Sequence, residues 1–490
     1  MAELRRSFAF SAAQSYIGVA LQLVSTVVLS RVLTPAEVGV FVVASAFGAL
    51  ATNFRDFGIA EYLIQARTLS RQNIQAAFAV NIGMSWLMAL AMFLGAGFAG
   101  EFYRSEVVAS VMRVQAISFL LIPFGAINQA WFRREMNFKP IFVAGVLSDV
   151  VALTVAIVLA LQGFGALSMA WSSLATIVVT VAVSLYFRPP DFPRWPALRG
   201  VREVLQFGSF ASGIYVLGQL GRSAPEMIIG RMQGVADVAI FSRGGGLVQL
   251  FRQLVLRAVT PVCLPYFSQA VREENNVGRA YVRGVAIFTV VGWTFLGFLA
   301  VAAFPSIRLV YGDQWGAAVP LARVLCLVGA VDLVHHLAKE ALLAHGQVKL
   351  ATRLQVLQQI LQVIGVSMVV PFGLMGACWG LLGASVLNLL VAQWHLQVGV
   401  QLGLRPLWQA CAGALRVAVP TLLPMLLISL AWPATEDNYL RHLLASGAVT
   451  GLAWLLMLRL QRHPLWAELV RAAAPLAQRL ARRSRPAPPA

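Results

Sequence analysis

Residues 207–251 read FGSFASGIYVLGQLGRSAPEMIIGRMQGVADVAIFSRGGGLVQLF, a stretch as apolar as a pair of membrane helices that nevertheless contains Arg222, Glu226 and Arg243. A charged side chain at the centre of a membrane-inserted helix costs about 2.5–3.5 kcal/mol. Because Arg222 and Glu226 are four residues apart, they share one face of a helix. We therefore predict that this face borders a polar cavity. The alternative is an ion pair between Arg222 and Glu226 that holds helices together.

The composition of the whole chain is that of a polytopic membrane protein. The 490 residues are 59% hydrophobic and 12% charged, with a mean hydropathy of +0.75, which exceeds what a globular core requires. The formal net charge is +18, but the basic residues are spread over short gaps between apolar segments, as the orientation of membrane helices demands. We therefore expect an all-α membrane protein that does not bind nucleic acid.

About fourteen apolar runs are long enough to cross a bilayer. They lie near residues 10–33, 38–54, 74–100, 107–131, 141–162, 165–187, 204–230, 236–258, 281–304, 316–344, 350–370, 373–397, 408–431 and 440–460. The eighth run is the least apolar, since it contains Arg243 and Arg252. If the N-terminus is inside, however, the loops expected inside hold most of the 38 Lys and Arg residues, and removing the eighth run would invert every later loop. We therefore retain it and place both termini in the cytoplasm.

The chain also repeats itself at an offset of 200 residues. SRVLTPAEVGVF at residues 30–41 aligns with GRMQGVADVAIF at residues 230–241. An even number of spans separates the copies, so both halves have the same orientation in the membrane. Between them, FRPPDFPRWPALRG at residues 187–200 is too rich in proline to continue a helix. The expected domains are an N-lobe at 1–187, a cytoplasmic linker at 188–203, a C-lobe at 204–400, two further spans within 401–460 and a basic cytoplasmic tail at 461–490.

The sequence contains no signature of a catalytic or nucleotide-binding site. It has no Walker sequence, no HExxH, no GxSxG and no GxGxxG that follows a strand. The four cysteines lie far apart in or beside apolar runs and form no metal-binding pattern with histidine. We therefore expect a protein that is not an enzyme and has neither a cofactor nor a metal site. Any uphill transport would draw on an ion gradient or on a partner.

The tenth span carries a second set of charges on one helix face. Asp332, His336 and Lys339 stand at positions i, i+4 and i+7. A carboxylate one turn from an imidazole can hold a proton near neutral pH, which a proton-coupled carrier requires. Further candidates, for a gate or the mouth of a cavity, lie in the second and fifth spans: Arg55, Asp56 and Asp149. A structural role is the alternative for these three.

Six segments of the chain occur in the same order in a known family. They read SRVLTPAEVGVF (30–41), RDFGIAEYLIQ (55–65), WFRREMNFKP (131–140), IIGRMQGVADVAIFSR (228–243), VYGDQWGAAVPLARVL (310–325) and LLAHGQVKLATRL (342–354). With them the chain resembles the polysaccharide transporter branch, the Wzx-type O-antigen and colanic acid exporters, of the multidrug/oligosaccharidyl-lipid/polysaccharide exporter superfamily. The resemblance covers roughly residues 5–400. It implies two six-helix lobes around a central cavity and two further C-terminal helices.

The resemblance also implies a function. Such a protein is a flippase that moves undecaprenyl-pyrophosphate-linked oligosaccharide repeat units across the bacterial cytoplasmic (inner) membrane by alternating access, for surface polysaccharide biosynthesis. Its partners would be this cargo, membrane lipids, a proton or sodium as coupling ion, and a polysaccharide polymerase. The anionic pyrophosphate requires cations in the cavity. The candidates are Arg222, Arg243 and Lys339 for the pyrophosphate and Glu226, Asp332 and His336 for the coupling ion.

The seventh span departs from the pattern of the branch. There an aspartate follows the arginine by about three residues, whereas here Glu226 follows Arg222 by four and comes directly after Pro225, which should bend the helix. The alternative function is that of a multidrug/cation antiporter of the same superfamily. Such an antiporter would have an apolar, aromatic cavity with a carboxylate and not several arginines.

Overall fold

The computed structural model describes residues 2–56, 58–65, 70–190, 192–193, 195–274, 277–467 and 469–471, and every regular element in these ranges is helical. The all-α fold expected from the sequence is confirmed. The first elements are α1 (Ala2–Val32), α2 (Pro35–Asp56), α3 (Ile59–Gln65), α4 (Arg71–Phe102), α5 (Glu106–Arg134), α6 (Phe138–Leu161), α7 (Ala166–Tyr186), α8 (Val201–Met232) and α9 (Val235–Phe251). They are followed by the π-helical turn η1 (Arg252–Leu256), α10 (Arg257–Glu274), α11 (Val277–Val301), α12 (Ala303–Tyr311), the 3-10 turn η2 (Asp313–Trp315), α13 (Ala318–His335), α14 (Ala338–Ala344), α15 (Val348–Val369), the 3-10 turn η3 (Val370–Phe372), α16 (Leu374–Val400), α17 (Leu404–Ala431) and α18 (Tyr439–Leu460).

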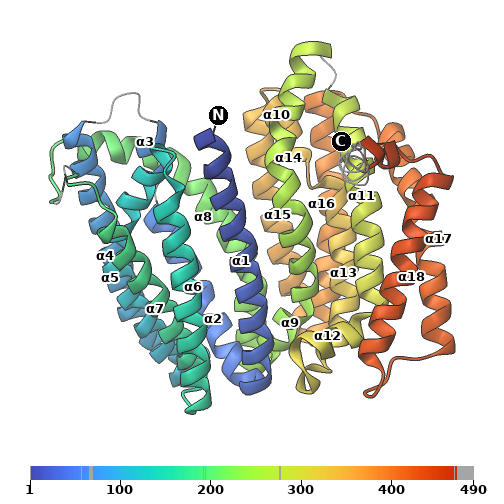
Figure 1. Ribbon diagram of the computed structural model, residues 1–490, viewed down its shortest axis with the longest axis horizontal. Helices are drawn as coiled ribbons and strands as arrows, with labels where there is room; N and C mark the ends of the chain where they lie inside the picture. Colours follow the sequence, from blue (N-terminus) through green and yellow to red (C-terminus); the bar gives the residue numbers. More distant parts are fainter. Residues whose placement is uncertain are drawn as a thin grey trace, which may run out of the picture. The chain divides into compact units, whose positions relative to one another are not determined.

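The chain folds into two compact units. Unit 1 comprises Met1–Arg243, Val310–Ala318 and Gln362–Gly380, and unit 2 comprises Gly244–Leu309, Val319–Leu361 and Leu381–Ala490. Within unit 1, α5 packs against α4 and α7, and α6 packs against α1 and α7; within unit 2, α17 packs against α11 and α18 (Figure 1). Each unit is therefore a bundle of long helices.

Twelve helices in the described residues are long and apolar enough to cross a membrane, compared with the expected fourteen. The two expected spans missing from this set are the seventh and eighth, which correspond to α8 and α9. The polar and charged residues of α8 lower its hydropathy, and α9 has only 17 residues before the π-helical turn η1 begins. The protein is a multi-pass membrane protein, and the count of fourteen stays a prediction.

The two copies of the sequence repeat meet in unit 1. A methyl group placed on Gly39 of α2 would come within 1.7 Å of the backbone oxygen of Val235, which begins α9. A methyl group on Gly230 of α8 would come within 2.9 Å of Val43 in α2. Glycine is required where backbones approach this closely, because any side chain would collide. The repeated segments therefore form a helix contact.

The end of α1 is completed by a distant part of the sequence. Gln314 donates hydrogen bonds to the backbone oxygens of Ser30 and Leu33 at 2.6 and 3.0 Å, and the Trp315 indole donates to that of Ser30 at 2.8 Å. The last carbonyls of a helix have no partner within the helix, so these side chains satisfy groups that would otherwise be costly to bury. The turn VYGDQW, which contributed to the family resemblance, thus acts as a cap.

The proline-rich linker expected between the lobes contains no helix between Phe187 and Gly200 in its described residues. Phe192 is buried in a cluster with Phe78 and Ile127, and its ring contacts that of Trp131. The linker is therefore packed against unit 1. Contacts place α8 in unit 1 as well, and the lobe boundaries inferred from the sequence stay a prediction. Most of the expected basic tail, residues 472–490, lies outside the described residues.

The contact at Gly39 generates a first prediction. Gly39→Ala should lower the apparent melting temperature of the purified protein by several degrees, because overpacking a tight contact costs about 1–3 kcal/mol. Gly95→Ala in α4 is the matched control, since nothing lies within 4 Å of a methyl group placed there and alanine favours a helix. Size-exclusion chromatography after heating would measure both. Equal melting temperatures would refute the contact.

Candidate functional site

A polar network in unit 2 is centred on Asp332. The Ser385 hydroxyl on α16 donates to Oδ1 of Asp332 at 2.5 Å, and the guanidinium of Arg252 in η1 lies 3.5 Å from Oδ2. Nε2 of His335 is 3.5 Å from Oδ1. On its other side, Nδ1 of His335 lies 3.3 Å from the side-chain nitrogen of Gln358 on α15. Four elements that are distant in sequence thus supply one cluster.

The charges in this network are unequally accessible. The Arg252 side chain is 51% exposed, that of Asp332 30% and that of His335 10%. A carboxylate is tolerated among apolar helices only where hydrogen bonds and an opposite charge compensate its lost hydration. Asp332 has both, and Arg252 keeps half of its surface available for a second anion.

The helix that carries Asp332 ends at His335. One continuous helix, as expected from the sequence, would put His336 one turn from Asp332. Helix α13 instead ends at His335, and His336 lies in the turn before α14, with its ring 6.5 Å from that of Phe288. His335 is therefore the histidine that lies 3.5 Å from the Asp332 carboxylate, and the expected role of His336 in ion coupling stays a prediction.

A buried side chain supports this break in the helix. The Tyr281 hydroxyl on α11 donates to the backbone oxygen of Val334 at 2.9 Å. In an unbroken helix that carbonyl would accept from the amide four residues later. Tyr281 is fully buried. Its hydroxyl therefore satisfies a carbonyl that loses its helical partner at the break.

The seventh-span charges of the sequence analysis have different partners from those expected. On α8, Nη2 of Arg222 donates to Oε1 of Gln219 at 2.8 Å, and the Gln219 amide donates to the Ser223 hydroxyl at 2.9 Å. Among the described residues no ion pair joins Arg222 to Glu226. Arg222 itself is exposed, while Glu226 is half-buried. The ion-pair alternative therefore fails, and a polar stripe along α8 remains.

Arg243 is held by aromatic rings. Its guanidinium carbon lies 5.1 Å from the centre of the Tyr311 ring and 5.1 Å from that of Trp315. Trp315 is fully buried and belongs to the turn that caps α1. Stacking of this kind stabilises a desolvated arginine by about 2 kcal/mol or more. In the structure Arg243 therefore packs within unit 1, and its expected role toward the pyrophosphate stays a prediction.

The remaining candidates are dispersed. Lys339 is exposed on α14, and Arg55 forms an ion pair with Asp56 at the end of α2. Asp149 on α6 lies beside α1, since a methyl group on Gly18 would be 3.2 Å from its Oδ2. These positions fit a gate as well as a structural role.

Several residues of the network, among them Arg252 and Ser385, were not predicted as site residues. Arg252 counted only as a charge that makes the eighth apolar run less hydrophobic, but it lies in η1, and single π-helical turns are frequent at functional sites. Ser385 and Asn388 stand three residues apart on α16, and the Asn388 amide donates to the backbone oxygen of Gln358 at 3.4 Å. The sequence feature that could have predicted this part of the site is a pair of small polar residues on one face of an otherwise apolar span.

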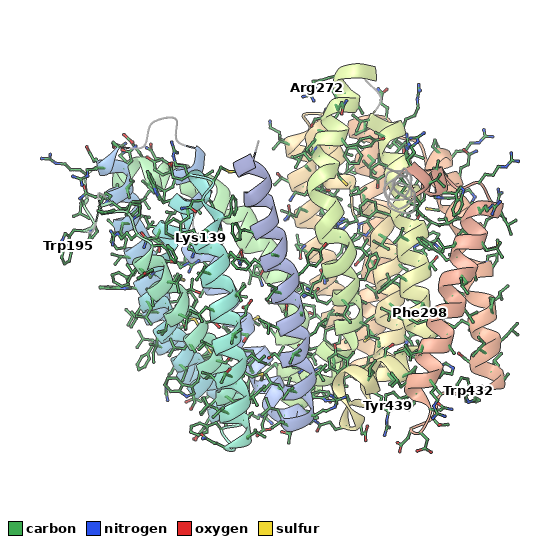
Figure 2. All side chains as sticks on the ribbon, viewed as in Figure 1. Lys139, Trp195, Arg272, Phe298, Trp432 and Tyr439 are labelled. Atoms are coloured by element: carbon green, nitrogen blue, oxygen red, sulfur yellow. The ribbon has the colours of Figure 1, made fainter. Side chains whose placement is uncertain are left out.

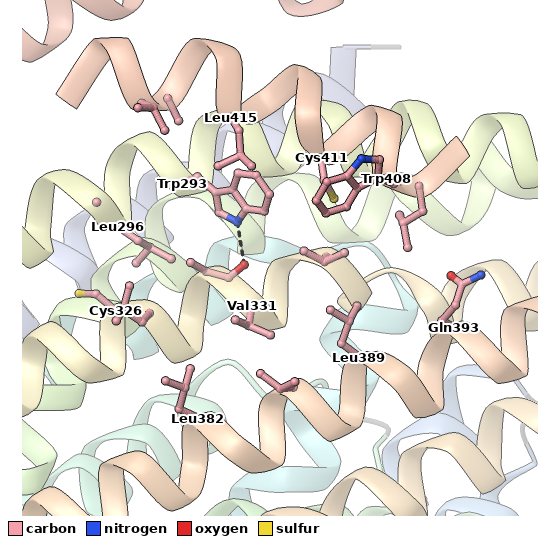
Figure 3. A pocket seen from close by; sticks show the side chains of 18 of the residues that line it. Trp293, Leu296, Cys326, Val331, Leu382, Leu389, Gln393, Trp408, Cys411 and Leu415 are labelled. Atoms are coloured by element: carbon pink, nitrogen blue, oxygen red, sulfur yellow. Dashed lines mark hydrogen bonds between the residues drawn. The ribbon is translucent and has the colours of Figure 1, made fainter. Parts of the chain in front are cut away.

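Unit 2 also contains an apolar cavity of about 1140 Å³ between α11, α13, α16 and α17 (Figure 3). Trp293 lies at its wall and donates to the backbone oxygen of Ala330 at 2.8 Å. Nearly all lining side chains are aliphatic or aromatic, with Gln393 and Arg405 as polar exceptions. Such a cavity suits hydrocarbon. No group of three or more metal-ligating side chains occurs in the part of the chain that the structure describes.

The comparison with known families decides the classification. A family model described as "Polysaccharide biosynthesis protein" matches residues 28–320, more than half of the chain. The chain belongs to this family. The resemblance seen in the sequence is thereby confirmed.

The names of curated relatives agree with this family. The chain is 23% identical to the lipopolysaccharide biosynthesis protein WzxC of Escherichia coli (strain K12) over 471 residues, which are 94% of each chain. It is also 23% identical to the teichuronic acid biosynthesis protein TuaB of Bacillus subtilis (strain 168), over 80% of this chain and 81% of TuaB.

Solved structures share the fold of this family member. The inward closed lipid II flippase MurJ superposes with a TM-score of 0.75 at 11% identity, over 92% of this chain and 99% of MurJ. An inward-facing multidrug resistance transporter of the MATE family superposes with a TM-score of 0.62 at 16% identity, over 81% of this chain and 95% of that transporter. The superfamily fold expected from the sequence is therefore confirmed.

The contrast between the two arginines generates a second prediction. Arg243→Ala should lower the apparent melting temperature by several degrees, because it removes a cation stacked on two rings. Arg222→Ala should change it little, since exposed substitutions usually stay within about 0.5 kcal/mol. Arg243→Lys, which keeps the charge but not the planar group, should lie between them. Equal destabilisation by Arg222→Ala and Arg243→Ala would refute the prediction that Arg243 has a special role in packing.

Proposed function

We propose that this family member is a lipid-linked oligosaccharide flippase of the bacterial cytoplasmic membrane. It moves undecaprenyl-pyrophosphate-linked repeat units across the membrane for surface polysaccharide biosynthesis, by ion-coupled alternating access, and acts as a transporter and not as an enzyme. The observation that carries the proposal is the half-exposed Arg252, held by Asp332 among apolar helices of unit 2. The names of WzxC and TuaB and the MurJ-like fold support it.

The chemistry of the cargo requires such an arginine. A pyrophosphate is anionic and cannot cross hydrocarbon without compensating cations, and guanidinium groups bind phosphate oxygens in pairs. Arg252, Arg222 and Lys339 each have exposed side chains that could contact an anion. The apolar cavity beside Trp293 would accommodate hydrocarbon of the polyprenyl tail. The pyrophosphate head would thus contact cationic side chains, and the polyprenyl tail would contact apolar ones.

Asp332 provides a means of coupling. With its carboxylate charged, it holds Arg252 and competes with the pyrophosphate for the same guanidinium. Uptake of a proton, or of sodium, at Asp332 would neutralise that carboxylate and free Arg252 for the cargo. His335, 3.5 Å away, is placed to pass the proton, and Glu226 on α8 is a second candidate. Ion entry would thereby be linked to cargo binding.

The proposal includes orientation and partners. Both termini would face the cytoplasm, because that orientation puts most of the basic residues inside. Membrane lipids would surround the helices, and a polysaccharide polymerase would receive the flipped repeat units. The competing function is multidrug/cation antiport, which the likeness to the MATE transporter favours at the level of fold. An apolar drug would not require Arg252.

The third prediction tests the role of the network in export. In a strain without its own copy of the gene, Arg252→Ala should reduce surface polysaccharide about 10-fold or more, because a lost charge-assisted hydrogen bond to the cargo costs about 1.5–3 kcal/mol. Asp332→Asn should reduce it too, because an amide can neither take up nor release the coupling ion. Arg252→Lys should retain part of the export. Immunoblots would confirm normal protein levels, and Arg272→Ala, at an exposed position on α10, is the control.

Two outcomes would contradict the proposal. Full export by Arg252→Ala, Arg222→Ala and Lys339→Ala at normal protein levels would remove the cations from the pathway. Normal surface polysaccharide in the deletion strain, together with a new sensitivity to cationic drugs, would instead support the antiporter.

A further inference from the structure

A second pocket of about 690 Å³, lined by both polar and apolar side chains, lies in unit 2 between α10, α11 and α17. Arg279 and Arg283 line it from the first two turns of α11. Tyr266 and Gln269 line it from α10, and Gln409 from α17. The two pockets have no lining residue in common. On α11 this pocket lies at residues 279–286 and the apolar cavity at residues 293–300, so the two are separate.

The chemistry of this pocket favours a phosphate group. Arg279 and Arg283 are four residues apart and therefore present both guanidinium groups to the same side of α11. The phenol of Tyr266 and the amides of Gln269 and Gln409 add neutral hydrogen-bond donors. Among the described residues that line the pocket, every charged one is an arginine. Two guanidinium groups with three neutral donors are a typical environment for phosphate oxygens.

The position of the pocket favours a lipid as the source of that phosphate. Arg283 lies six residues from the first residue of α11, about 9 Å along the helix axis, so the pocket is near one end of unit 2. Figure 2 shows Arg272 at this end of the unit, while Trp432 and Tyr439 lie at the opposite end. Tyr266 is 41% exposed and Trp408, next to Gln409, is 70% exposed. Exposed Tyr and Trp at this depth are typical of the headgroup region.

The charge at this end identifies the leaflet and the class of lipid. Besides the pocket arginines, the same end carries exposed arginines at the last turn of α10, the start of α17 and the end of α18: Arg272, Arg405, Arg459 and Arg462. Basic residues concentrate on the cytoplasmic side of membrane proteins, where the leaflet is anionic. We propose that the Arg279–Arg283 pocket binds the phosphate headgroup of an anionic phospholipid of the inner leaflet.

A lipid bound there would have a structural consequence that is independent of the cargo. The headgroup would connect α10 and α17 to α11, so the protein should be more stable in membranes that contain anionic lipid. The proposal does not rest on the flippase function, and its test uses no transport assay.

The experiment compares lipids and variants of the full-length protein. In micelles of a neutral detergent, phosphatidylglycerol should raise the apparent melting temperature by about 5 °C, because a ligand that binds the folded state stabilises it. Phosphatidylcholine and inorganic phosphate should have little effect. Arg279→Gln/Arg283→Gln should lose the response, whereas Arg272→Gln/Arg459→Gln, which removes the same charge from exposed positions of the same end, should keep it.

A second measurement covers the case in which the double variant folds poorly. Gln409→Leu alters one neutral donor on the opposite wall, and native mass spectrometry should find phosphatidylglycerol retained at least about threefold less often than by the unchanged protein. Equal responses of the pocket and control variants would refute the proposal. A full response to inorganic phosphate alone would refute it too, by showing a free-phosphate site.

Discussion

A polar group inside a bilayer must find its partner within the protein, because hydrocarbon offers none. The described structure follows this constraint at the end of α1 and at the break after His335. Gln314 and Trp315 supply donors to the end of α1, and Tyr281 supplies one to the break after His335. The Asp332 network applies the same rule to a side-chain charge. Because these partners come from distant helices, they define which helices pack together, and the site and the fold have one physical basis.

Much of the architecture could be predicted because bilayer-spanning helices require long apolar runs and a consistent distribution of positive charge. The repeat at residues 30–41 and 230–241 was also visible, since close packing at Gly39 and Gly230 restricts the residues on either side. The pairing of Asp332 could not be predicted. Helical periodicity assumes an unbroken helix, whereas this helix breaks after His335, and the carbonyl of Val334 accepts a hydrogen bond from Tyr281, 53 residues away in the sequence. The role of Arg243 could not be predicted either, because the sequence does not show whether an arginine in an apolar run contacts an anion or aromatic rings.

We infer two different roles for intramembrane arginines of this protein, packing and anion binding. Arg243, although charged and intramembrane, contributes to packing through Tyr311 and Trp315. Arg252, which was not predicted as a site residue, combines exposure with a carboxylate partner. The residues around an intramembrane arginine therefore indicate its role better than its charge alone does. An arginine between rings is already compensated, whereas one beside a single, partly exposed carboxylate can exchange that partner for another anion.

The cap on α1 has a consequence for the order in which the protein is made. Ser30 accepts its hydrogen bond from a tryptophan 285 residues later in the chain. At about 5–20 residues per second, roughly 15 to 60 s of synthesis separate the two, during which the first helices are already in the membrane. Unit 1 also awaits the segments Val310–Ala318 and Gln362–Gly380 before it is complete. The N-terminal helices must therefore persist as an unfinished assembly while most of unit 2 is inserted, so the biogenesis of this half depends on the translation of the other.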